Sequence, residues 1–239
     1  MIRLQKIVFR SGGQKITGTL ILPSEQNTKY PGVIFFHGRG ASEERYVSHA
    51  EKLVQAGIAC LTFSFRGCGS SEGKFLDQTI RNGIEDAAAA YHFFVKSGYV
   101  DKKRIGICGR SFGGLLAAEM AIRVHIRSLA LAAPAVHKRQ WLDKVIERIP
   151  RGGIEAFRGQ KSFHGTEPVR RMWKYRGNLL LIEHEKDEVI PRAVVEAYYD
   201  CAGTEDKTWV RIENAKHRLD EAREGAFTQI IADWFSETL

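Results

Sequence analysis

The sequence predicts an α/β fold built on a mostly parallel, eight-stranded sheet flanked by helices. Short apolar runs alternate along the chain with segments of helical periodicity, and most of the runs are apolar along their whole length. Strands of this kind are buried on both faces, which parallel sheets achieve because helices cover them. A chain of 239 residues has room for one such domain with an insertion.

Two strands of alternating polarity are expected first, at about residues 2–10 and 15–22, and the turn Ser11-Gly12-Gly13 joins them into an antiparallel hairpin at a sheet edge. The later strands are expected at 33–36, 58–65, 105–108, 129–132, 179–182 and 209–212. Helical patterns lie near 43–56, 78–97, 111–124, 191–202 and 220–237. Ligands of parallel sheets bind beyond the carboxyl ends of the strands, so the loops there are the expected place for a site.

The alternation stops between residues 136 and 176, which we expect to form a cap inserted into a core made of residues 1–135 and 177–239. This segment is basic, with eleven lysines and arginines against four acidic residues. It also carries the aromatic residues Trp141, Phe157, Phe163, Trp173 and Tyr175. Two interpretations stay open: these rings line a pocket, or they form the apolar underside of a solvated helical face.

The composition argues against several other classes of protein. The net charge is +8, but 28 acidic residues are dispersed along the chain and no nucleic-acid-binding motif is present, so we expect no nucleic-acid partner. No apolar run is long enough to span a membrane, and the first ten residues alternate like a strand rather than a secretory signal. We therefore expect a cytoplasmic protein.

The four cysteines predict neither disulfides nor a metal site. Cys60, Cys68, Cys108 and Cys201 include no C-x-x-C pair and no histidine at a spacing typical of zinc. Cys60 and Cys108 fall in predicted strands, where free thiols behave as small apolar residues. Reduced thiols are expected, and no metal or organic cofactor is indicated.

The segment from residue 104 to residue 114 is the most informative about function. A short apolar strand leads into Gly109-Arg110-Ser111-Phe112-Gly113, and strong helix formers follow at once. A serine in so sharp a turn has a strained backbone, and only small neighbours let the strand and helix pass so closely. A second Gly-x-Ser-x-Gly pattern, around Ser71, lies well past its strand and precedes polar residues, which indicates an ordinary loop serine. Ser111 is the predicted nucleophile.

A serine hydroxyl is a poor nucleophile at neutral pH, so it needs a base and a group that orients the base. His217 is the predicted base, because it lies between the last strand and the final helix, where a loop can carry an imidazole over the sheet. Asp187 is the predicted acid, because Glu183 and Glu185 are expected to remain on the preceding strand. Glu188, in the same turn, is the rival.

The negative charge that develops on the substrate oxygen in such a reaction needs two preorganised donors. The backbone N–H of Phe112, directly after the nucleophile, is expected to be one, and that of Arg39, in the loop after the strand at 33–36, the other. His37, at the start of that loop, is expected to be a structural residue.

Together these motifs resemble the α/β-hydrolase superfamily. The resemblance rests on His37-Gly38-Arg39-Gly40, the loop Arg66-Gly67-Cys68-Gly69-Ser70-Ser71, the elbow at Ser111, Asp187 with Val189 and Pro191, and His217. It runs from about residue 16 to the C-terminus, excluding the cap, and is closest to small esterases and serine peptidases with a cap after the sixth strand. Two departures stand out: relatives often carry Asp where Ser64 stands here, and often Gly-x-x-Asp where Glu185-Lys186-Asp187 lacks the glycine.

The resemblance implies a serine hydrolase that acts through an acyl-enzyme, and we expect a carboxylesterase that acts on a small-molecule ester. The basic cap suggests an acidic or polar substrate. A serine peptidase of the aminopeptidase or acylaminoacyl type shares all these residues and is the nearest alternative. A hydrolase fold used only as a binding module is an alternative of another class. The sequence leaves homo-oligomerisation open.

Overall fold

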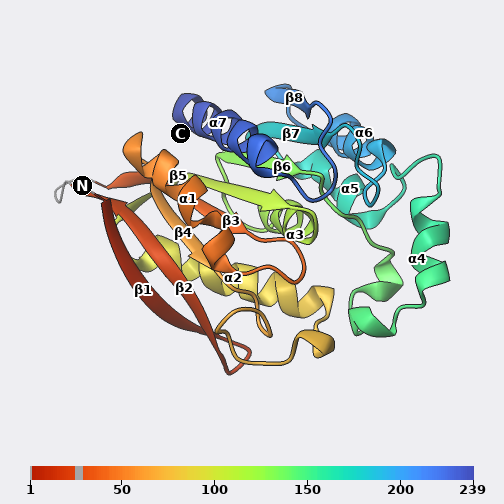
Figure 1. Ribbon diagram of the computed structural model, residues 1–239, viewed down its shortest axis with the longest axis horizontal. Helices are drawn as coiled ribbons and strands as arrows, with labels where there is room; N and C mark the ends of the chain where they lie inside the picture. Colours follow the sequence, from red (N-terminus) through yellow and green to blue (C-terminus); the bar gives the residue numbers. More distant parts are fainter. Residues whose placement is uncertain (1, 25–28) are drawn as a thin grey trace.

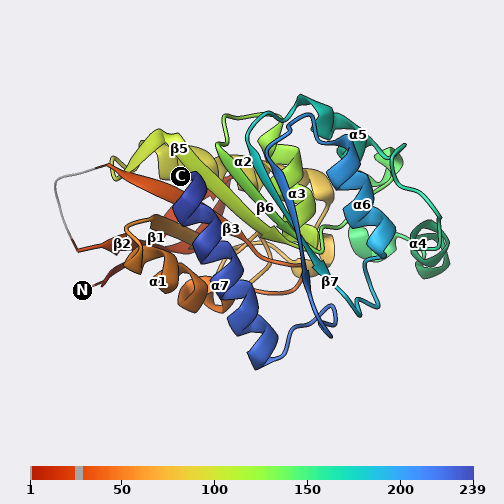
Figure 2. The same ribbon diagram turned by 90° about the horizontal axis from the view of Figure 1, so that it is seen from above.

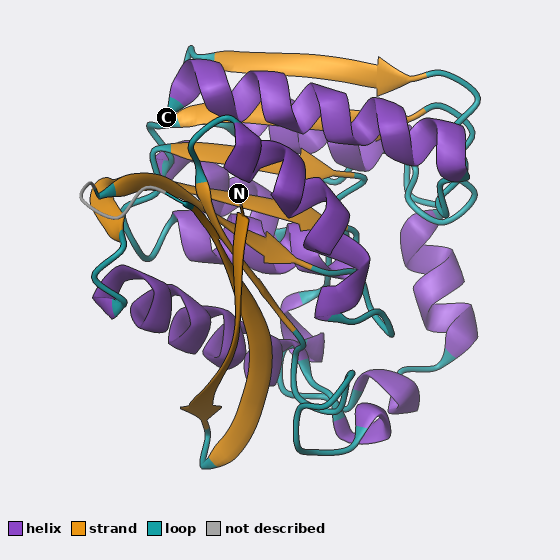
Figure 3. Ribbon diagram, turned by 60° about the vertical axis from the view of Figure 1, so that its left-hand side comes forward, coloured by secondary structure: helices purple, strands orange, loops and turns teal. Residues whose placement is uncertain are grey.

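The computed structural model describes residues 2–24 and 29–239 and contains one eight-stranded sheet in the order β1-β2-β4-β3-β5-β6-β7-β8 (Figure 1). The strands are β1 (Ile2–Ser11), β2 (Gln14–Pro23), β3 (Tyr30–Phe36), β4 (Ala59–Phe63), β5 (Val100–Arg110), β6 (Ser128–Ala132), β7 (Asn178–His184) and β8 (Lys207–Ile212). The pairs β1–β2 and β2–β4 are antiparallel, and all others are parallel. The predicted fold class is confirmed, with the hairpin at one edge. Figure 3 shows the hairpin running at a steep angle to the strands of the opposite edge, as the twist of a large sheet requires.

Helices cover both faces of the sheet (Figure 2). One face packs against α1 (Val47–Gln55) and α7 (Glu221–Thr238), and the other against α2 (Ile80–Lys96), α3 (Phe112–Ala121) and α6 (Arg192–Cys201). The strands alternate their side chains between two apolar clusters, so that Val33 and Phe35 face the α1–α7 layer, while Ile34 and Phe36 face the α2–α3 layer. This double burial is why these runs are apolar throughout.

The segment from residue 136 to residue 176 contains only short helices. These are η3 (Arg139–Trp141), η4 (Ile146–Arg148), α4 (Arg151–Arg158), α5 (Glu167–Arg171) and η5 (Met172–Lys174). In Figure 1, α4 lies at the edge of the molecule, apart from the sheet. We call residues 136–176 the cap segment.

The first part of the cap segment is fastened to the loop before α2. Val145 forms an isolated antiparallel bridge with Thr79, and the Ile146 N–H donates to the Gln78 carbonyl at 2.9 Å. The Arg81 N–H donates to the Leu142 carbonyl at 3.0 Å, and the Arg81 side chain pairs with Asp143. These contacts fix residues 142–146 against the core.

Two predicted strand ends are wrong in detail. The strand expected at 58–65 ends at Phe63, because the chain turns there and the Ser64 N–H donates to the Thr17 carbonyl at 2.9 Å. Glu185 does not remain on β7, which ends at His184; its carboxylate instead accepts the Asn214 N–H at 2.7 Å. No helix within residues 2–24 and 29–239 is both long and apolar enough to cross a membrane.

Candidate active site

Ser111 occupies the turn between β5 and α3, with φ 56° and ψ −118°. This left-handed conformation is strained for a residue with a side chain. A Cβ on Gly109 would lie 2.4 Å from the Gly113 carbonyl oxygen, and one on Gly113 would lie 2.0 Å from that of Phe36. Both glycines are therefore required for strand and helix to pass so closely. The Ser111 carbonyl accepts the Leu115 and Ala135 N–H groups at 3.1 and 2.9 Å, which hold the turn.

The structure brings Ser111, His217 and Asp187 into one hydrogen-bonded chain. The Ser111 Oγ lies 3.0 Å from Nε2 of His217, and Nδ1 of His217 lies 2.9 Å from Oδ2 of Asp187. Asp187 Oδ1 also accepts the N–H groups of Val189 and Ile190, each at 2.8 Å. Burial alone would raise the pKa of Asp187, but the hydrogen bonds from His217 and Ile190 outweigh it and the pKa is lowered. Asp187 therefore stays ionised and fixes the imidazole with Nε2 toward Ser111.

Glu188 contacts the backbone of His217 rather than its ring. Its carboxylate is exposed and accepts the His217 N–H at 3.1 Å. This hydrogen bond is the main reason that the pKa of Glu188 lies below its usual value. Of the two carboxylates in this turn, Asp187 is the one placed at the imidazole.

His37 is a buried structural residue at the start of the loop that follows β3. Its Nδ1 donates to the Gly38 carbonyl at 2.8 Å, and its Nε2 accepts the Phe65 N–H at 3.0 Å. Burial lowers the pKa of His37 to about 4, partly offset by the bond to Gly38. The neutral ring thus ties the loop after β3 to the loop after β4.

Arg39 and Phe112 both line the pocket that contains Ser111. Phe112 is the first residue of α3, so its N–H has no acceptor within the helix. The loop of Arg39 adjoins the elbow, because a Cβ on Gly38 would lie 3.6 Å from the Ser111 Cβ. The Arg39 guanidinium lies 4.4 Å from the centre of the Phe75 ring and 2.7 Å from the carboxylate of Glu147 in the cap segment.

An ion pair next to the elbow, between buried Arg110 and partly exposed Glu224, was not predicted. Arg110, which precedes Ser111, donates to both carboxylate oxygens of Glu224 in the first turn of α7, at 2.8 and 2.7 Å. Glu224 also accepts Arg45 at 2.7 Å and lies 3.4 Å from His49 of α1. Burial alone would raise the pKa of Glu224, but the hydrogen bonds from Arg110 and His49 outweigh it and lower the pKa. The only sequence signal was a charged residue inside the Gly-x-Ser-x-Gly pattern.

At Ser64, where relatives often carry Asp, the structure shows a contact with Glu43 that the sequence did not predict. The Ser64 hydroxyl donates to the buried carboxylate of Glu43 and accepts the Glu43 N–H at 3.1 Å. Ser71 is a buried loop serine, as expected: its hydroxyl donates to the Ser64 carbonyl at 2.6 Å and accepts the Thr17 N–H at 3.0 Å.

The pocket over Ser111 has a volume of about 150 Å³ and is mostly apolar. Its walls come from α3, from the cap segment and from the start of α6, and include Leu115, Trp141, Ile146, Ile149, Ile154, Phe157, Ile190 and Val194. The charged or titratable side chains that line it are those of Arg39, His137 and Arg158; among the described residues, no Asp or Glu lines it.

Of the aromatic residues of the cap segment, some line the pocket and others do not. Trp141 and Phe157 line the pocket, with ring centres 5.1 Å apart. Phe163 is buried behind Phe157, and Tyr175 is buried with its hydroxyl on the Asn178 carbonyl at 2.9 Å. Trp173 is 57% exposed and does not line the pocket.

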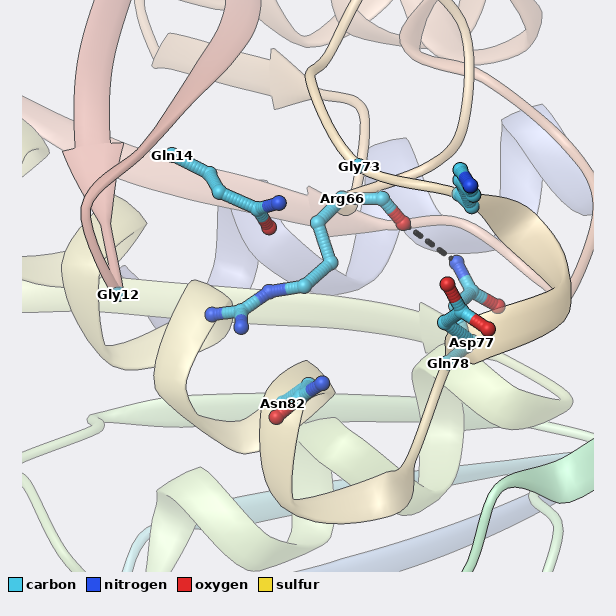
Figure 4. Close-up of a pocket in the computed structure, with 8 residues that line it drawn as sticks. Gly12, Gln14, Arg66, Gly73, Asp77, Gln78 and Asn82 are labelled. Atoms are coloured by element: carbon cyan, nitrogen blue, oxygen red, sulfur yellow. Dashed lines mark hydrogen bonds between the residues drawn. The ribbon is translucent and has the colours of Figure 1, made fainter.

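A larger hollow of about 590 Å³ lies away from Ser111, beside the hairpin turn (Figure 4). Arg66 crosses it between Gln14 and Asn82, and its carbonyl accepts the Gln78 side chain at 2.7 Å. The Arg66 guanidinium is already bound to the buried Asp86 at 2.6 Å. The arginine that lines this hollow thus already belongs to a structural ion pair. In the part of the chain that the structure describes, no group of His, Cys, Asp or Glu is arranged to hold a metal ion.

Known hydrolases match this chain in sequence. Residues 31–157 match the family described as serine aminopeptidase, S33. The quorum-quenching protein AidA of Acinetobacter baumannii is 34% identical over 112 residues, which are 45% of this chain but only 36% of AidA. The chain therefore matches little more than a third of that relative's length.

Solved structures resemble this chain over nearly its whole length. Est1E of Butyrivibrio proteoclasticus, solved with ferulic acid bound, has a TM-score of 0.78 and 22% identity and covers 97% of this chain and 98% of its own. The acetyl xylan esterase of Paenibacillus sp. R4 has a TM-score of 0.74 and 17% identity, with 97% and 84% covered. At these identities the likeness shows the fold. With the family match over residues 31–157, the chain belongs to the α/β-hydrolase superfamily and, within it, to the serine aminopeptidase S33 family of hydrolases.

Proposed function

We propose that this protein is a serine carboxylesterase that cleaves small esters through an acyl-enzyme. The observation that carries the proposal is the hydrogen-bonded chain from Ser111 through His217 to Asp187 at an apolar pocket. His217 takes the proton of Ser111 as the hydroxyl oxygen attacks the ester carbonyl, and Asp187 stabilises the imidazolium. His217 then gives that proton to the departing alcohol, and a water molecule, activated in the same way, releases the acid.

The N–H groups of Arg39 and Phe112 are proposed to bind the oxyanion of the tetrahedral intermediate. Two observations support this assignment. The Phe112 N–H at the start of α3 has no acceptor within the helix, and the backbone at Gly38 passes beside Ser111. Donors aimed at a developing negative charge lower the barrier because they are already oriented before the reaction begins; removing one costs about 10²- to 10³-fold in rate.

The charge of the pocket favours an esterase over an aminopeptidase. The substrate of an aminopeptidase has a charged α-ammonium group near the scissile bond, and burying such a group without an acidic or carbonyl partner is unfavourable. The described lining of the pocket holds two arginines and no carboxylate. The esterase names of two structural neighbours agree with this choice.

The pocket volume sets the expected size of the substrate. At about 150 Å³ the pocket is much smaller than the roughly 300–1,000 Å³ of sites that enclose drug-sized ligands, so we expect a short acyl group. We expect p-nitrophenyl butyrate to react faster than the octanoate, and both acyl esters to react faster than aminoacyl p-nitroanilides. Faster anilide turnover would instead identify a peptidase.

The serine is tested separately with a fluorophosphonate probe. The wild-type protein should be labelled and Ser111→Ala should be neither labelled nor active, whereas Ser70→Ala, at an exposed position of the loop after β4, should behave as the wild type. A protein that is not labelled at Ser111 and cleaves no ester would be a binding module, and the proposed function would be wrong.

A further inference from the structure

The two arginines that line the pocket differ in how their charges are satisfied. Arg39 is bound to Glu147 and stacks on Phe75. Arg158, the last residue of α4, forms no ion pair and no side-chain hydrogen bond with any residue that the structure describes. An unpaired guanidinium at an apolar pocket has five donors available to a ligand.

The backbone position of Arg158 is set by its buried neighbour Phe157. Phe157 is buried between Trp141 and Phe163, with ring centres 5.1 and 5.5 Å away, and it anchors α4 to the rest of the cap segment. The helix ends at Arg158, so this exposed side chain extends from the anchored end of α4 and reaches the edge of the pocket.

A second cation lies close to the same ring. The Lys138 ammonium lies 5.4 Å from the centre of the Phe157 ring and 5.5 Å from that of Trp141, and it has no acidic partner among the described residues. Arg158 and Lys138 thus place unneutralised positive charge beside the aromatic wall of the pocket. An anionic ligand group would be favoured there, and a cationic one disfavoured.

We propose that the physiological substrate carries a carboxylate on its acyl part and that Arg158 binds this carboxylate. This inference rests on the proposed esterase function. The acyl part stays bound to Ser111 after the alcohol has left, so it is the part that the pocket must hold until water attacks. Since the pocket is small, the substrate class is a monoester of a short dicarboxylic acid.

The test compares monomethyl adipate with methyl hexanoate, which has the same chain length but no second carboxylate, by titrating the released acid. The wild-type protein should have the higher kcat/KM for the adipate monoester. Arg158→Gln should lower the ratio of the two kcat/KM values about five- to tenfold, mainly through the KM of the anionic ester. Arg158→Glu should lower it further, because it places like charges together.

Arg151→Gln is the matched control, since Arg151 begins the same helix, carries the same charge and does not line the pocket. It should leave the ratio unchanged. An equal fall in Arg151→Gln would show general attraction by the basic cap and overturn the role of Arg158. Fluorophosphonate labelling of Ser111 in every variant verifies that the site is folded.

The remaining outcomes separate the two proposals. If the wild-type protein cleaves both esters equally well, or prefers methyl hexanoate, the carboxylate inference is wrong while the esterase function stands. If it cleaves neither these nor the p-nitrophenyl esters, the esterase function is wrong and this inference is wrong with it.

Discussion

Arg110 and Glu224 form a two-point ion pair that joins the strand before Ser111 to the helix that follows the His217 loop. The Arg110 side chain is 6% exposed and that of Glu224 21% exposed, and the guanidinium also lies 4.4 Å from the centre of the Phe227 ring. The two chain segments that carry the proposed nucleophile and base are therefore fastened to each other outside the site itself.

Glu224→Gln should destabilise the protein because it leaves Arg110 buried without a charged partner. Breaking a buried pair costs about 3–5 kcal/mol, and the partial exposure of Glu224 reduces the expected loss to about 2–4 kcal/mol in the free energy of unfolding. Urea denaturation measures it. Glu221→Gln, an exposed position in the same helical turn, should change the stability by less than about 0.5 kcal/mol. Similar losses in both variants would contradict the importance of this pair.

Asp187→Asn should lower kcat for p-nitrophenyl butyrate by about 10²- to 10⁴-fold, because an amide neither stabilises the imidazolium nor selects the correct tautomer of His217. Glu188→Gln should lower kcat less than about tenfold, since Glu188 contacts only the backbone of His217. The reverse order would assign the orienting role to Glu188.

His37 should make the stability of the protein depend on pH in mildly acidic solution. Its pKa is about 4 in the folded state, against an ordinary value of 6.5 for a solvated histidine, so between these values the unfolded chain binds the extra proton. Stability is therefore complete above pH 6.5 and falls as the pH drops toward 4, by up to about 3 kcal/mol at 1.36 kcal/mol per pKa unit.

The measurement is the free energy of unfolding between pH 7.5 and 4.5, obtained from urea titrations. His37→Gln, whose amide oxygen can still accept the Phe65 N–H, should reduce the slope against pH by up to one proton. His92→Gln, at an exposed position of α2, should keep the wild-type slope. An unchanged slope in His37→Gln would show that His37 does not carry this pH dependence.

Gly113→Ala should prevent the elbow from forming its native geometry. The added Cβ would lie 2.0 Å from the Phe36 carbonyl oxygen, which is backbone and cannot move aside, so we expect a loss above about 3 kcal/mol and no fluorophosphonate labelling. Gly225→Ala in α7 meets no atom within 4 Å and should stabilise the protein by about 0.5–1 kcal/mol. Thermal unfolding compares the two, and a neutral Gly113→Ala would refute the steric argument.

The fold and the three hydrogen-bonded residues Ser111, His217 and Asp187 could be predicted from the sequence, because both follow from local sequence pattern and sheet topology. Parallel strands bring their carboxyl ends to one edge, so residues after β5, β7 and β8 had to lie near one another. The Arg110–Glu224 and Ser64–Glu43 contacts depend instead on how α7 and the short helix η1 (Glu43–Tyr46) pack against the core, and hydrophobic periodicity does not predict that packing. The catalytic roles, the oxyanion donors and the division into core and cap stay predictions.

The walls of the Ser111 pocket differ in how they are attached. The stretch around Ile146 is hydrogen-bonded to the loop before α2 and, through Glu147, to Arg39. The wall formed by α4 has Gly152 and Gly153 in its first turn, and a Cβ added at either would meet no atom within 4 Å. A library aimed at new acyl groups should therefore randomise Ile154 and Arg158 and keep Phe157 and residues 142–147 constant, because that design reshapes the specificity wall without removing the anchor of α4 or disturbing the loop that carries Arg39.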